Sequence, residues 1–409
     1  MGYAERKEQS LQGNVPNLRF PEFSEEWKHV ALSEIAARVT RKNKDNASKL
    51  PLTISAQYGL VDQISFFNKV VASADMSNYY LLRQGEFAYN KSYSSDYPWG
   101  AIKRLDRYPQ GALSSLYICF AVNDKVDSDF AVHYFESSKW HREVSNIAGE
   151  GARNHGLLNI AVGDFFDTKH RLPSSKEEQK KIAALLNLIT ERIATQIKII
   201  EKLESLIRGI VETHYSQCEC INQVRISELG EPFSTMNMSK EDLSEEGNEC
   251  ILYGELFTTY GCVIKEVNSR THISTNKATV SQSNDLLFPA STTVDAMSLI
   301  APSAICKEGV ILGGDLFGVH VNKNYNNEYL SYLINYIYKS KLARYAQGST
   351  IIHLHYSDIK NATLLLPTIE EQNYLAHIMR VVEEKINIEK DMLSKLYSQK
   401  AYLLSNLFI

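Results

Sequence analysis

Cationic and aromatic side chains alternate in one segment of the first half of the chain, between residues 89 and 107. The candidate contact residues in this segment are Lys91, Ser92, Tyr93, Trp99, Lys103 and Arg104. Cations of this kind hold a protein on phosphate groups, whereas hydroxyl, amide and guanidinium groups read the edges of bases. A solvated surface loop with aromatic rings packed beneath it would have the same composition, so these residues alone leave both interpretations open.

A second candidate segment, Ser291, Thr292 and Thr293, offers hydroxyl groups and little charge. Further cations cluster at residues 38–44 and 339–344, but the whole chain has a net charge of -4, from 44 Lys plus Arg against 48 Asp plus Glu. Neutralising phosphates supplies most of the affinity of a protein for DNA. The charge therefore indicates either that the chain does not bind DNA or that partners share the contact.

Recognisable catalytic motifs are absent from the sequence. No glycine is followed by lysine, which excludes a P-loop, and the zinc-protease, hydrolase and dinucleotide-binding fingerprints are also missing. Cys218 and Cys220 lie in an expected linker at a spacing that suits neither a disulfide nor a metal. His353 and His355 would share one face of a strand, but no carboxylate or thiol partner is evident. The sequence therefore predicts a binding protein without catalytic residues, metal or cofactor of its own.

The candidate segments belong to a chain that repeats itself at an offset of 193 residues. The repeated sequences are LPSSKEEQKKIAALL at 172–186 and LPTIEEQNYLAHIM at 366–379. Ser175 and Thr368 occupy N-cap positions, each followed three residues later by Glu178 or Glu371, which predicts two capping boxes. Two helices of about 40 residues, or about 60 Å, should begin there.

Apolar residues at alternating spacings of three and four predict a coiled-coil seam in each helix. The seam positions are Leu186, Ile189, Ile193, Gln196, Ile200 and Leu203 in the first helix and Val382, Ile386, Glu389, Leu393 and Leu396 in the second. A two-fold relation between the halves would make the helices antiparallel and bring Gln196 to Glu389. Such a polar layer would fix their alignment at some cost in stability.

Matching segments before each helix indicate a mixed α and β domain in each half. The pairs are 30–39 with 224–233, 85–92 with 284–291, and 111–123 with 309–322. The predicted boundaries are an N-terminal arm at 1–20, a first domain at 21–172, a first spacer helix at 173–216, a second domain at 217–366 and a second helix at 367–409. The loops that follow the paired strands diverge, as expected of two similar modules that read different things.

This order of segments resembles the specificity subunit of type I restriction-modification enzymes. The resemblance covers nearly the whole chain and is carried by VPNLRFPEFSEEWKHVALSEI at 15–35, by the segments at 89–108 and 288–317, and by the two repeated helix starts. It implies an α+β fold with two target-recognition domains joined by two long antiparallel coiled-coil helices in a pseudo-two-fold internal repeat. As loop positions that face DNA, it supplies Lys91, Ser92, Tyr93, Ser291 and Thr292.

The resemblance also implies a non-catalytic role. Each target-recognition domain would read one half of a split site in double-stranded DNA, and the helices would set the gap and dock two methyltransferase subunits. Two translocase-nuclease subunits would join the full complex, and S-adenosylmethionine, ATP and Mg would belong to these partners. A cytoplasmic protein with no membrane association is expected, because no stretch of 18 apolar residues occurs.

Two other functions stay open. One is a non-catalytic protein-protein scaffold with twin peptide-binding domains, which the basic and aromatic loop disfavours. The other is a self-contained nuclease, for which no metal-binding carboxylate cluster is recognisable. Sequencing of DNA methylation with and without the gene would separate the specificity subunit from the scaffold.

Overall fold

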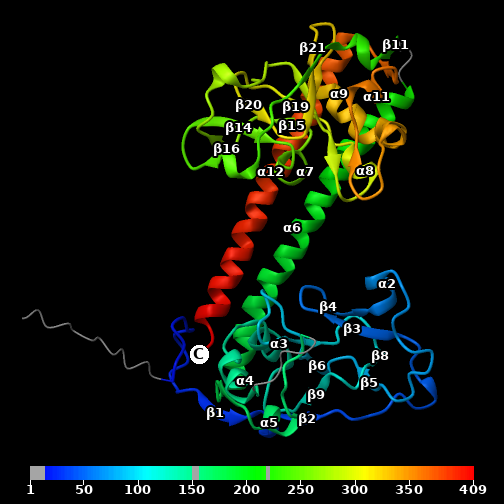
Figure 1. The fold of residues 1–409 in the computed structure, drawn as a ribbon. Coiled ribbons are helices and arrows are strands. Elements are labelled where there is room, and N and C mark those ends of the chain that lie inside the picture. Colours follow the sequence, from blue (N-terminus) through cyan, green and yellow to red (C-terminus); the bar gives the residue numbers. More distant parts are fainter. Residues whose placement is uncertain (1–13, 150–155, 218–221) are drawn as a thin grey trace, which may run out of the picture. The chain divides into compact units, whose positions relative to one another are not determined.

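The chain forms two compact units in the computed structural model, which describes residues 14–149, 156–217 and 222–409 (Figure 1). The first unit comprises Met1–Thr195 with Met392–Ile409, and the second comprises Gln196–Asp391. Cys218, Cys220 and most of the predicted arm at 1–20 lie outside the described residues. The predicted domain boundaries remain a prediction.

The first unit contains two four-stranded sheets, ordered β2-β9-β6-β7 and β4-β3-β8-β5, and a separate pair of β1 with β10. Its strands are β1 (Lys28–Ala31), β2 (Ala36–Arg38), β3 (Pro51–Ser55), β4 (Gly59–Asp62), β5 (Tyr80–Arg83), β6 (Phe87–Asn90), β7 (Ala101–Arg104), β8 (Gln110–Leu113), β9 (Ile118–Val122) and β10 (Lys169–Leu172). Its short helices are α1 (Leu32–Ile35), η1 (Lys44–Asn46), α2 (Gln63–Phe67), α3 (Ser128–Glu136), α4 (His141–Ile147) and α5 (Val162–Asp167). Aromatic rings fill its core, where Phe87 stacks on Phe120 with 5.4 Å between ring centroids.

The second unit contains a five-stranded sheet, β12-β21-β17-β19-β15, a four-stranded sheet, β13-β16-β14-β20, and the pairs β18-β22 and β11-β23. Its strands are β11 (Asn222–Arg225), β12 (Gly230–Ser234), β13 (Leu243–Ser244), β14 (Asn248–Leu252), β15 (Val263–Ile264), β16 (Ser269–Thr271), β17 (Asp285–Pro289), β18 (Ser291–Thr292), β19 (Ser303–Ile305), β20 (Ile311–Gly313), β21 (Leu316–Val321), β22 (Ile352–His353) and β23 (Thr363–Leu366). Its short helices are η2 (Ile226–Glu228), η3 (Lys240–Asp242), α7 (Glu255–Thr258), η4 (Thr275–Lys277), α8 (Ala296–Leu299), α9 (Asn327–Leu333), the π-helix η5 (Ile334–Tyr338), α10 (Lys339–Leu342), η6 (Ala343–Tyr345) and α11 (Tyr356–Ile359).

The predicted internal repeat is confirmed by the strand pairings. The antiparallel pair β1-β10 corresponds to β11-β23, and the order β2-β9-β6-β7 corresponds to β12-β21-β17-β19. A parallel pair also occurs in both units, as β3-β8 and β14-β20. The segments at 30–39 and 224–233 both run from a strand through one short helical turn into a second strand. The two halves therefore share one α+β scaffold.

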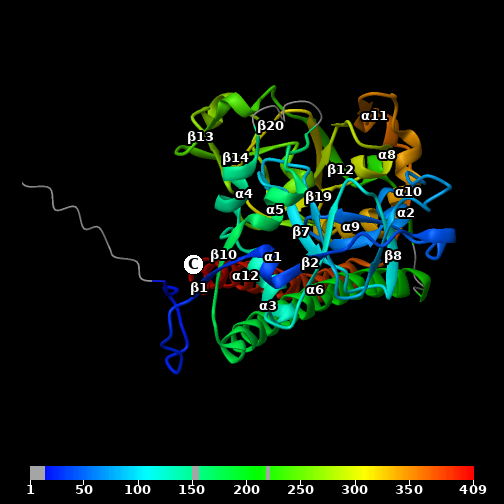
Figure 2. The same ribbon diagram turned by 90° about the horizontal axis from the view of Figure 1, so that it is seen from below.

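The long helices α6 (Lys176–Gln217) and α12 (Ile369–Asn406) have 42 and 38 residues, and each unit contains part of both (Figures 1 and 2). In the second unit, Gln196 Nε2 donates to the backbone carbonyl of Glu389 (3.2 Å) and to its carboxylate. In the first unit, the Trp27 indole donates to Glu178 (3.2 Å) near the start of α6 and packs against Phe408, which follows the end of α12. The helices are therefore antiparallel within each unit, as predicted.

One of the two helix starts, that of α6, differs from the prediction. The capping box of α12 is complete, with Glu371 N donating to Thr368 Oγ1 (3.4 Å) and Thr368 N donating to the Glu371 carboxylate (3.3 Å). At α6, Glu178 N donates to Ser175 Oγ (3.4 Å), but the Glu178 carboxylate binds Arg19 through two contacts of 2.7 and 2.8 Å. The prediction of a capping box at Ser175 is therefore wrong for one of its two contacts, the one in which the Glu178 carboxylate accepts from the backbone amide of Ser175. The carboxylate binds Arg19 instead, because the charged guanidinium is a stronger donor than a backbone amide.

The glutamine of each repeated motif makes the same contacts in its unit, which gives the repeat of the motif a structural reason. Gln179 Oε1 accepts from Asp127 N (2.7 Å), the N-cap of α3, and Gln372 Oε1 accepts from Asn326 N (3.0 Å), the N-cap of α9. The side-chain amides donate to the proline carbonyls, from Gln179 to Pro173 (3.0 Å) and from Gln372 to Pro367 (2.9 Å). Both glutamines are buried. Each therefore joins the start of a long helix to the start of one helix in the globular part of its unit, α3 in the first unit and α9 in the second.

The predicted seam positions lie along the facing sides of α6 and α12. Leu186, Ile189, Ile193, Gln196, Ile200, Ile386, Glu389 and Leu396 are buried, and Leu203, Val382 and Leu393 are half-buried. Burial in a stripe of this spacing is typical of two packed helices. Over the described residues, neither α6, α12 nor any shorter helix has the length and apolar character needed to cross a membrane.

Candidate nucleic-acid interface

The candidate segment of the first unit begins as a loop after β6 and returns to the sheet at β7. Its backbone is tied to a second segment, because Leu158 N donates to Lys91 O (2.9 Å). Ser92 lies opposite Leu157 in an antiparallel bridge. These contacts use only backbone groups, so they do not occupy the side chain of Lys91.

The end of this loop closes tightly. Gly100 has a φ of +75°, and a Cβ atom there would lie 2.1 Å from the carbonyl oxygen of Asn90, so only glycine fits. The buried Tyr89 donates its hydroxyl to Trp99 O (2.8 Å), and burial raises its pKa above the ordinary value. Trp99 is half-buried, whereas Tyr93 is 41% exposed. The loop therefore has a fixed base and presents exposed aromatic side chains.

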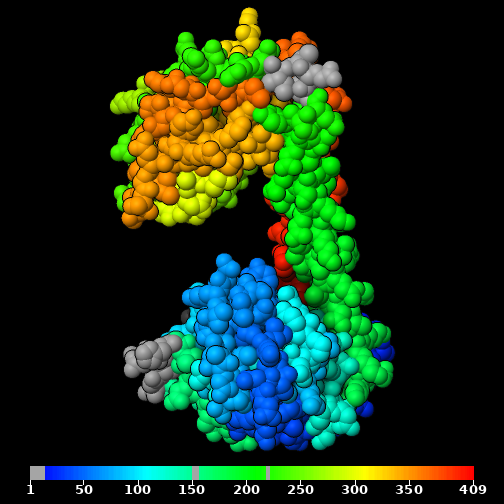
Figure 3. All heavy atoms as spheres, turned by 90° about the vertical axis from the view of Figure 1, so that its right-hand side faces the viewer, coloured from blue at the N-terminus to red at the C-terminus, as the bar shows by residue number. Residues whose placement is uncertain are grey.

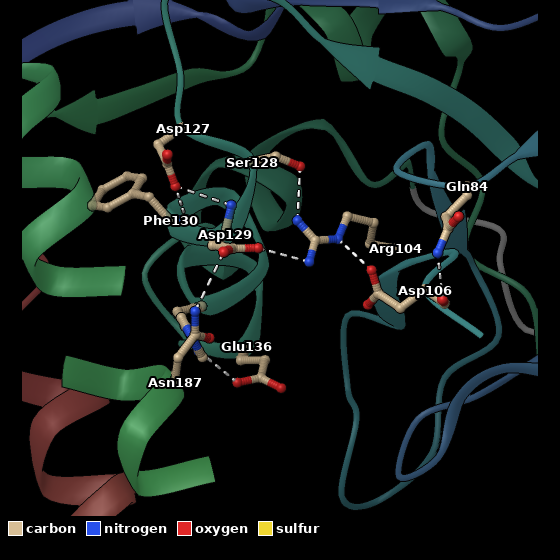
Figure 4. A network of polar contacts seen from close by, with 10 residues as sticks. Gln84, Arg104, Asp106, Asp127, Ser128, Asp129, Phe130, Glu136 and Asn187 are labelled. Carbon is tan, nitrogen blue, oxygen red and sulfur yellow. Dashed lines mark hydrogen bonds and ion pairs between the residues drawn. The ribbon is translucent and has the colours of Figure 1, made fainter. Parts of the chain in front are cut away.

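Arg104, at the end of β7, is engaged inside the unit. Its guanidinium forms ion pairs with Asp106 (2.6 Å) and Asp129 (2.7 Å) and donates to Ser128 Oγ (2.8 Å). Figure 4 shows the Arg104 guanidinium between Asp106, which follows β7, and Ser128 and Asp129 at the start of α3. The guanidinium N–H groups of Arg104, which were predicted to contact DNA, thus bind three acceptors within the unit and hold β7 against α3.

Lys103 is half-buried beside a charged cluster of the first unit. Burial lowers its pKa, although Glu136 acts in the opposite direction. Burial alone would raise the pKa of Glu136, but the hydrogen bond from His133 and the charges of Lys400 and Lys103 outweigh it and lower that pKa to about 2. Glu136 forms an ion pair with Lys400 (3.0 Å). Lys103 therefore contributes to an internal charge balance.

The candidate segment of the second unit forms the short strand β18 and the turn after it. Ser291 pairs with His353 and Thr292 pairs with Ile352, both in antiparallel register. Ser291 is buried, Thr292 is half-buried and Thr293 is exposed. The Thr293 hydroxyl is thus exposed, and the Thr292 hydroxyl accepts from Val294 N (3.3 Å) but keeps its own proton to donate, whereas Ser291 is not freely available.

The two candidate segments occupy equivalent positions. Leu354 N donates to Ala290 O (2.9 Å) in the second unit, just as Leu158 N donates to Lys91 O in the first. This match places Ser92 on Ser291, as the aligned sequences at 85–92 and 284–291 predict. The scaffold therefore presents Lys91 and Tyr93 in one unit where Ala290 and Thr292 stand in the other.

The local basic clusters are partly used within the fold. Arg41 pairs with Glu86 (2.9 Å), and the side-chain hydrogen bond to Glu86 raises the pKa of the guanidinium. Lys341 Nζ lies 4.8 Å from the centroid of the Tyr338 ring, yet its residue is exposed, as is Arg344. The second unit therefore presents cations on α10 and η6 near the second candidate segment.

No set of three or more His, Cys, Asp or Glu side chains is placed to hold a metal ion within residues 14–149, 156–217 and 222–409. His353 and His355 have nearly parallel rings 6.2 Å apart. The DNA contacts predicted for Lys91, Ser92, Tyr93, Trp99, Lys103, Arg104, Ser291, Thr292 and Thr293 stay predictions. The sequence did not reveal that a later segment of each unit pairs with the candidate loop, because such pairing leaves no periodic signal.

Comparison with known proteins gives matches of two kinds. Residues 221–397 match the model of the type I restriction modification DNA specificity domain. The type I S subunit from M. genitalium is 15% identical, with a TM-score of 0.57, over 97% of this chain and 99% of that one. A chain from a structure of the type I R-M system, solved for its complex assembly and conformational transition, is 16% identical, with a TM-score of 0.55, over 93% and 97% of the two chains.

The sequence match covers the second unit's globular part and much of α12, while the structural matches extend over nearly the whole chain. Structural matches with 15 and 16% sequence identity show a shared fold and no more. The feature that this chain has in common with them is a mixed α and β scaffold with a long linking helix. Residues 221–397 are therefore similar to the type I restriction modification DNA specificity domain, and the chain as a whole has the fold seen in a type I specificity subunit.

Proposed function

We propose that the chain is the sequence-specific DNA-binding subunit of a type I restriction-modification complex, in which each unit reads one half of a split DNA site. The supporting observation is the equivalence of two loops on one repeated scaffold. Both are held by the same backbone hydrogen bond, at Lys91 and at Ala290, and they carry different side chains. A scaffold that holds the backbone and changes the side chains is suited to reading two different base sequences.

The first unit would position itself on phosphate with Lys91 and read bases with Tyr93 and Tyr97, which are 41% and 38% exposed. The second unit would use Arg344 for phosphate and Thr292 and Thr293 for base edges. Hydroxyl groups hydrogen-bond to several bases, and a threonine methyl contacts thymine. Within the unit, Arg104 would hold β7 against α3, and Lys103 would balance the charge of Glu136.

The long helices would set the unread gap and dock the two methyltransferase subunits. Their outer sides carry exposed apolar side chains beside the buried seam, which is typical of helices that receive a partner. These residues are Leu188, Ile199, Leu206, Tyr374, Val381, Ile388, Met392, Tyr397 and Tyr402. Partner subunits would also supply the positive charge that a chain of net charge -4 lacks.

The chemistry would belong to the partners. Two methyltransferase subunits would use S-adenosylmethionine, and two translocase-nuclease subunits would use ATP and Mg. The chain itself would act without a catalytic residue, in the cytoplasm, on double-stranded DNA.

Methylome sequencing tests this proposal. Cells that carry the chain with its methyltransferase partners should show adenine methylation at a motif of two specified halves around an unspecified gap. The mark should vanish when this chain alone is deleted. Persistence of the mark without the chain, or a continuous motif without a gap, would reject the proposal and favour a protein-binding scaffold.

A four-residue insertion in both long helices tests the role of the helices. About one added turn of helix should lengthen the unread gap while leaving both half-sites unchanged. An unchanged gap in an active complex would show that helix length does not set the spacing.

A further inference from the structure

A hairpin at residues 347–353 stands beside the candidate segment of the second unit. Gln347 and His353 exchange two backbone hydrogen bonds of 2.9 and 2.7 Å. Gly348 has a φ of +117°, and a Cβ atom there would lie 2.1 Å from the carbonyl oxygen of Ile351. Only glycine fits this turn. The turn therefore projects a short, well-defined tip in which Ile351 is 49% exposed.

The hairpin is fixed to the candidate segment by its second strand, β22. Leu354 is fully buried and bonds to Ala290, while α8 packs against both β18 and β22. Side chains alternate along an extended backbone. His353 and His355 therefore point to the exposed face, while Leu354 between them points into the core. In Figure 3 the orange atoms, near residues 340–355, adjoin yellow atoms, near residue 300, on the surface of this unit.

The two histidines line a cleft of about 520 Å³. The other lining residues are Asp315, Gln347, Gly348 and Asp358. The carboxylates of Asp315 and Asp358 would repel a phosphate but accept hydrogen bonds from the exocyclic amino group of cytosine or adenine. An imidazole N–H donates to acceptors such as N7 and O6 of guanine. The chemistry of this cleft thus suits base edges, whereas Lys341 and Arg344 suit the phosphates.

We infer that residues 347–355 form a second DNA-reading segment of the second unit, in which His353 and His355 contact base edges next to Thr292. This inference rests on the proposed function and adds specificity residues to it. The equivalent positions of the first unit, given by the bonds of Leu158 and Leu354, hold Leu157 and Asn159. The two units therefore differ at this second segment as well as at the first.

The test copies the first unit's residues into the second. His353→Leu with His355→Asn is introduced into the full chain and combined with the methyltransferase partners. His272→Leu is the matched control, since His272 is an exposed histidine elsewhere in the same unit. Circular dichroism melting and co-purification with the partners check folding and assembly. Selection from a randomised DNA library then measures the base preference at every position of both half-sites.

The inference predicts a loss or change of base preference, at least tenfold at one position or more, in one half-site only. The other half-site and the gap should stay as in the wild type, and His272→Leu should change nothing. Unchanged preferences in an assembled variant overturn this inference while leaving the proposed function intact, and so does an equal weakening across both halves. A wild-type complex that selects no split motif rejects the proposed function itself.

Discussion

In both units a cation pairs with a carboxylate in the first turn of a helix, α3 in the first unit and α9 in the second. The cation comes from a different element in each unit. In the first unit, Arg104 at the end of β7 pairs with Asp129 at the start of α3 (2.7 Å). In the second, the residue after β19 is Cys306, whose thiol donates to Glu328 (3.2 Å) at the start of α9. The cation there is Arg380 of α12, 3.3 Å from the same carboxylate. The scaffold thus preserves a charge relation while the residue that supplies it moves from a strand to a long helix.

The candidate reading segments show the same separation of geometry from side chain. Backbone hydrogen bonds hold both, and such bonds do not depend on which side chain is present. Lys91 and Tyr93 can therefore be replaced by Ala290 and Thr292 without loss of the loop's anchor. Variation should therefore be tolerated at these positions, because the bonds that anchor the loop do not involve these side chains.

Exchange of a whole domain should give the largest effect. Replacement of residues 21–172 by the corresponding domain of another specificity subunit should change one half-site completely and leave the other half-site and the gap unchanged. Methylome sequencing measures both halves at once. A change in both halves would show that the units do not read independently.

Acidification should distinguish the two units. Burial lowers the pKa of His170 to about 4 from an ordinary value of 6.5, so between these values the unfolded chain binds a proton that the folded chain does not. The free energy of unfolding of the first unit should therefore fall as pH drops from 6.5 to 4, by up to about 1.4 kcal/mol per pH unit. The second unit has buried Leu364 at the equivalent position.

The three tryptophans, Trp27, Trp99 and Trp140, all lie in the first unit, so their fluorescence reports its unfolding. His170→Leu, which copies Leu364, should flatten the dependence of that transition on pH between 6.5 and 4. An equally steep dependence in the variant would mean that other groups cause it.

Loss of Arg104 should destabilise the first unit by about 2 kcal/mol, because its guanidinium is largely buried and binds three acceptors. Arg104→Met is compared with Arg107→Met, an exposed control that should change nothing, by tryptophan fluorescence during denaturation. Adding Asn187→Arg, which copies Arg380 of the second unit, should restore part of the loss. A stable Arg104→Met variant that binds DNA poorly would instead support a direct DNA contact.

The two motif glutamines should be equally important. Gln179→Ala removes three hydrogen bonds of a buried side chain, one of them a longer bond to Lys125 O (3.3 Å), and Gln372→Ala removes two, with an expected loss of about 1 to 2 kcal/mol in the unit concerned. Thermal melting of each single variant, followed by tryptophan fluorescence and by circular dichroism, checks the symmetry. A large loss from only one of the two would show that the repeat is unequal at this point.

The smallest effect is expected where the two helices share one polar contact. Gln196→Leu combined with Glu389→Leu should raise stability slightly, by about 1 kcal/mol, while loosening the register of α6 against α12. The Lys385 ion pair lowers the pKa of Glu389, with a further contribution from Gln196. Cysteine crosslinking at neighbouring seam positions measures the register. A register as narrow as in the wild type would remove this role for the polar pair.

Sequence reasoning predicted the parts of the fold that repeat at a constant spacing. The helix starts, the seam and the meeting of Gln196 with Glu389 all follow from an offset of 193 residues and from helical periodicity. It did not predict that Arg104 turns inward or that Glu178 binds Arg19. Both outcomes depend on partners distant in sequence, and side-chain type alone does not distinguish an internal cation from one that binds phosphate.

The hairpin at 347–353 is a further case. Its only sequence signal is Gly348 in a polar stretch, and its pairing with Ser291 joins segments about 60 residues apart. Long-range pairing of short strands leaves no pattern within either segment. In the second unit, the sequence therefore predicted the first segment of the candidate site, at 291–293, but not the second segment, at 347–355.

Burial of Phe408 against Trp27 and Phe130 has a consequence for how the protein is made. A ribosome releases the N-terminal part of a chain first, and that part ordinarily folds first. Here the aromatic core of the first unit lacks one of its rings until residue 408 has been synthesised, after the whole of the second unit. The region translated first is thus among the last to be completed, and a prematurely terminated product would carry an unfinished core that proteases can recognise.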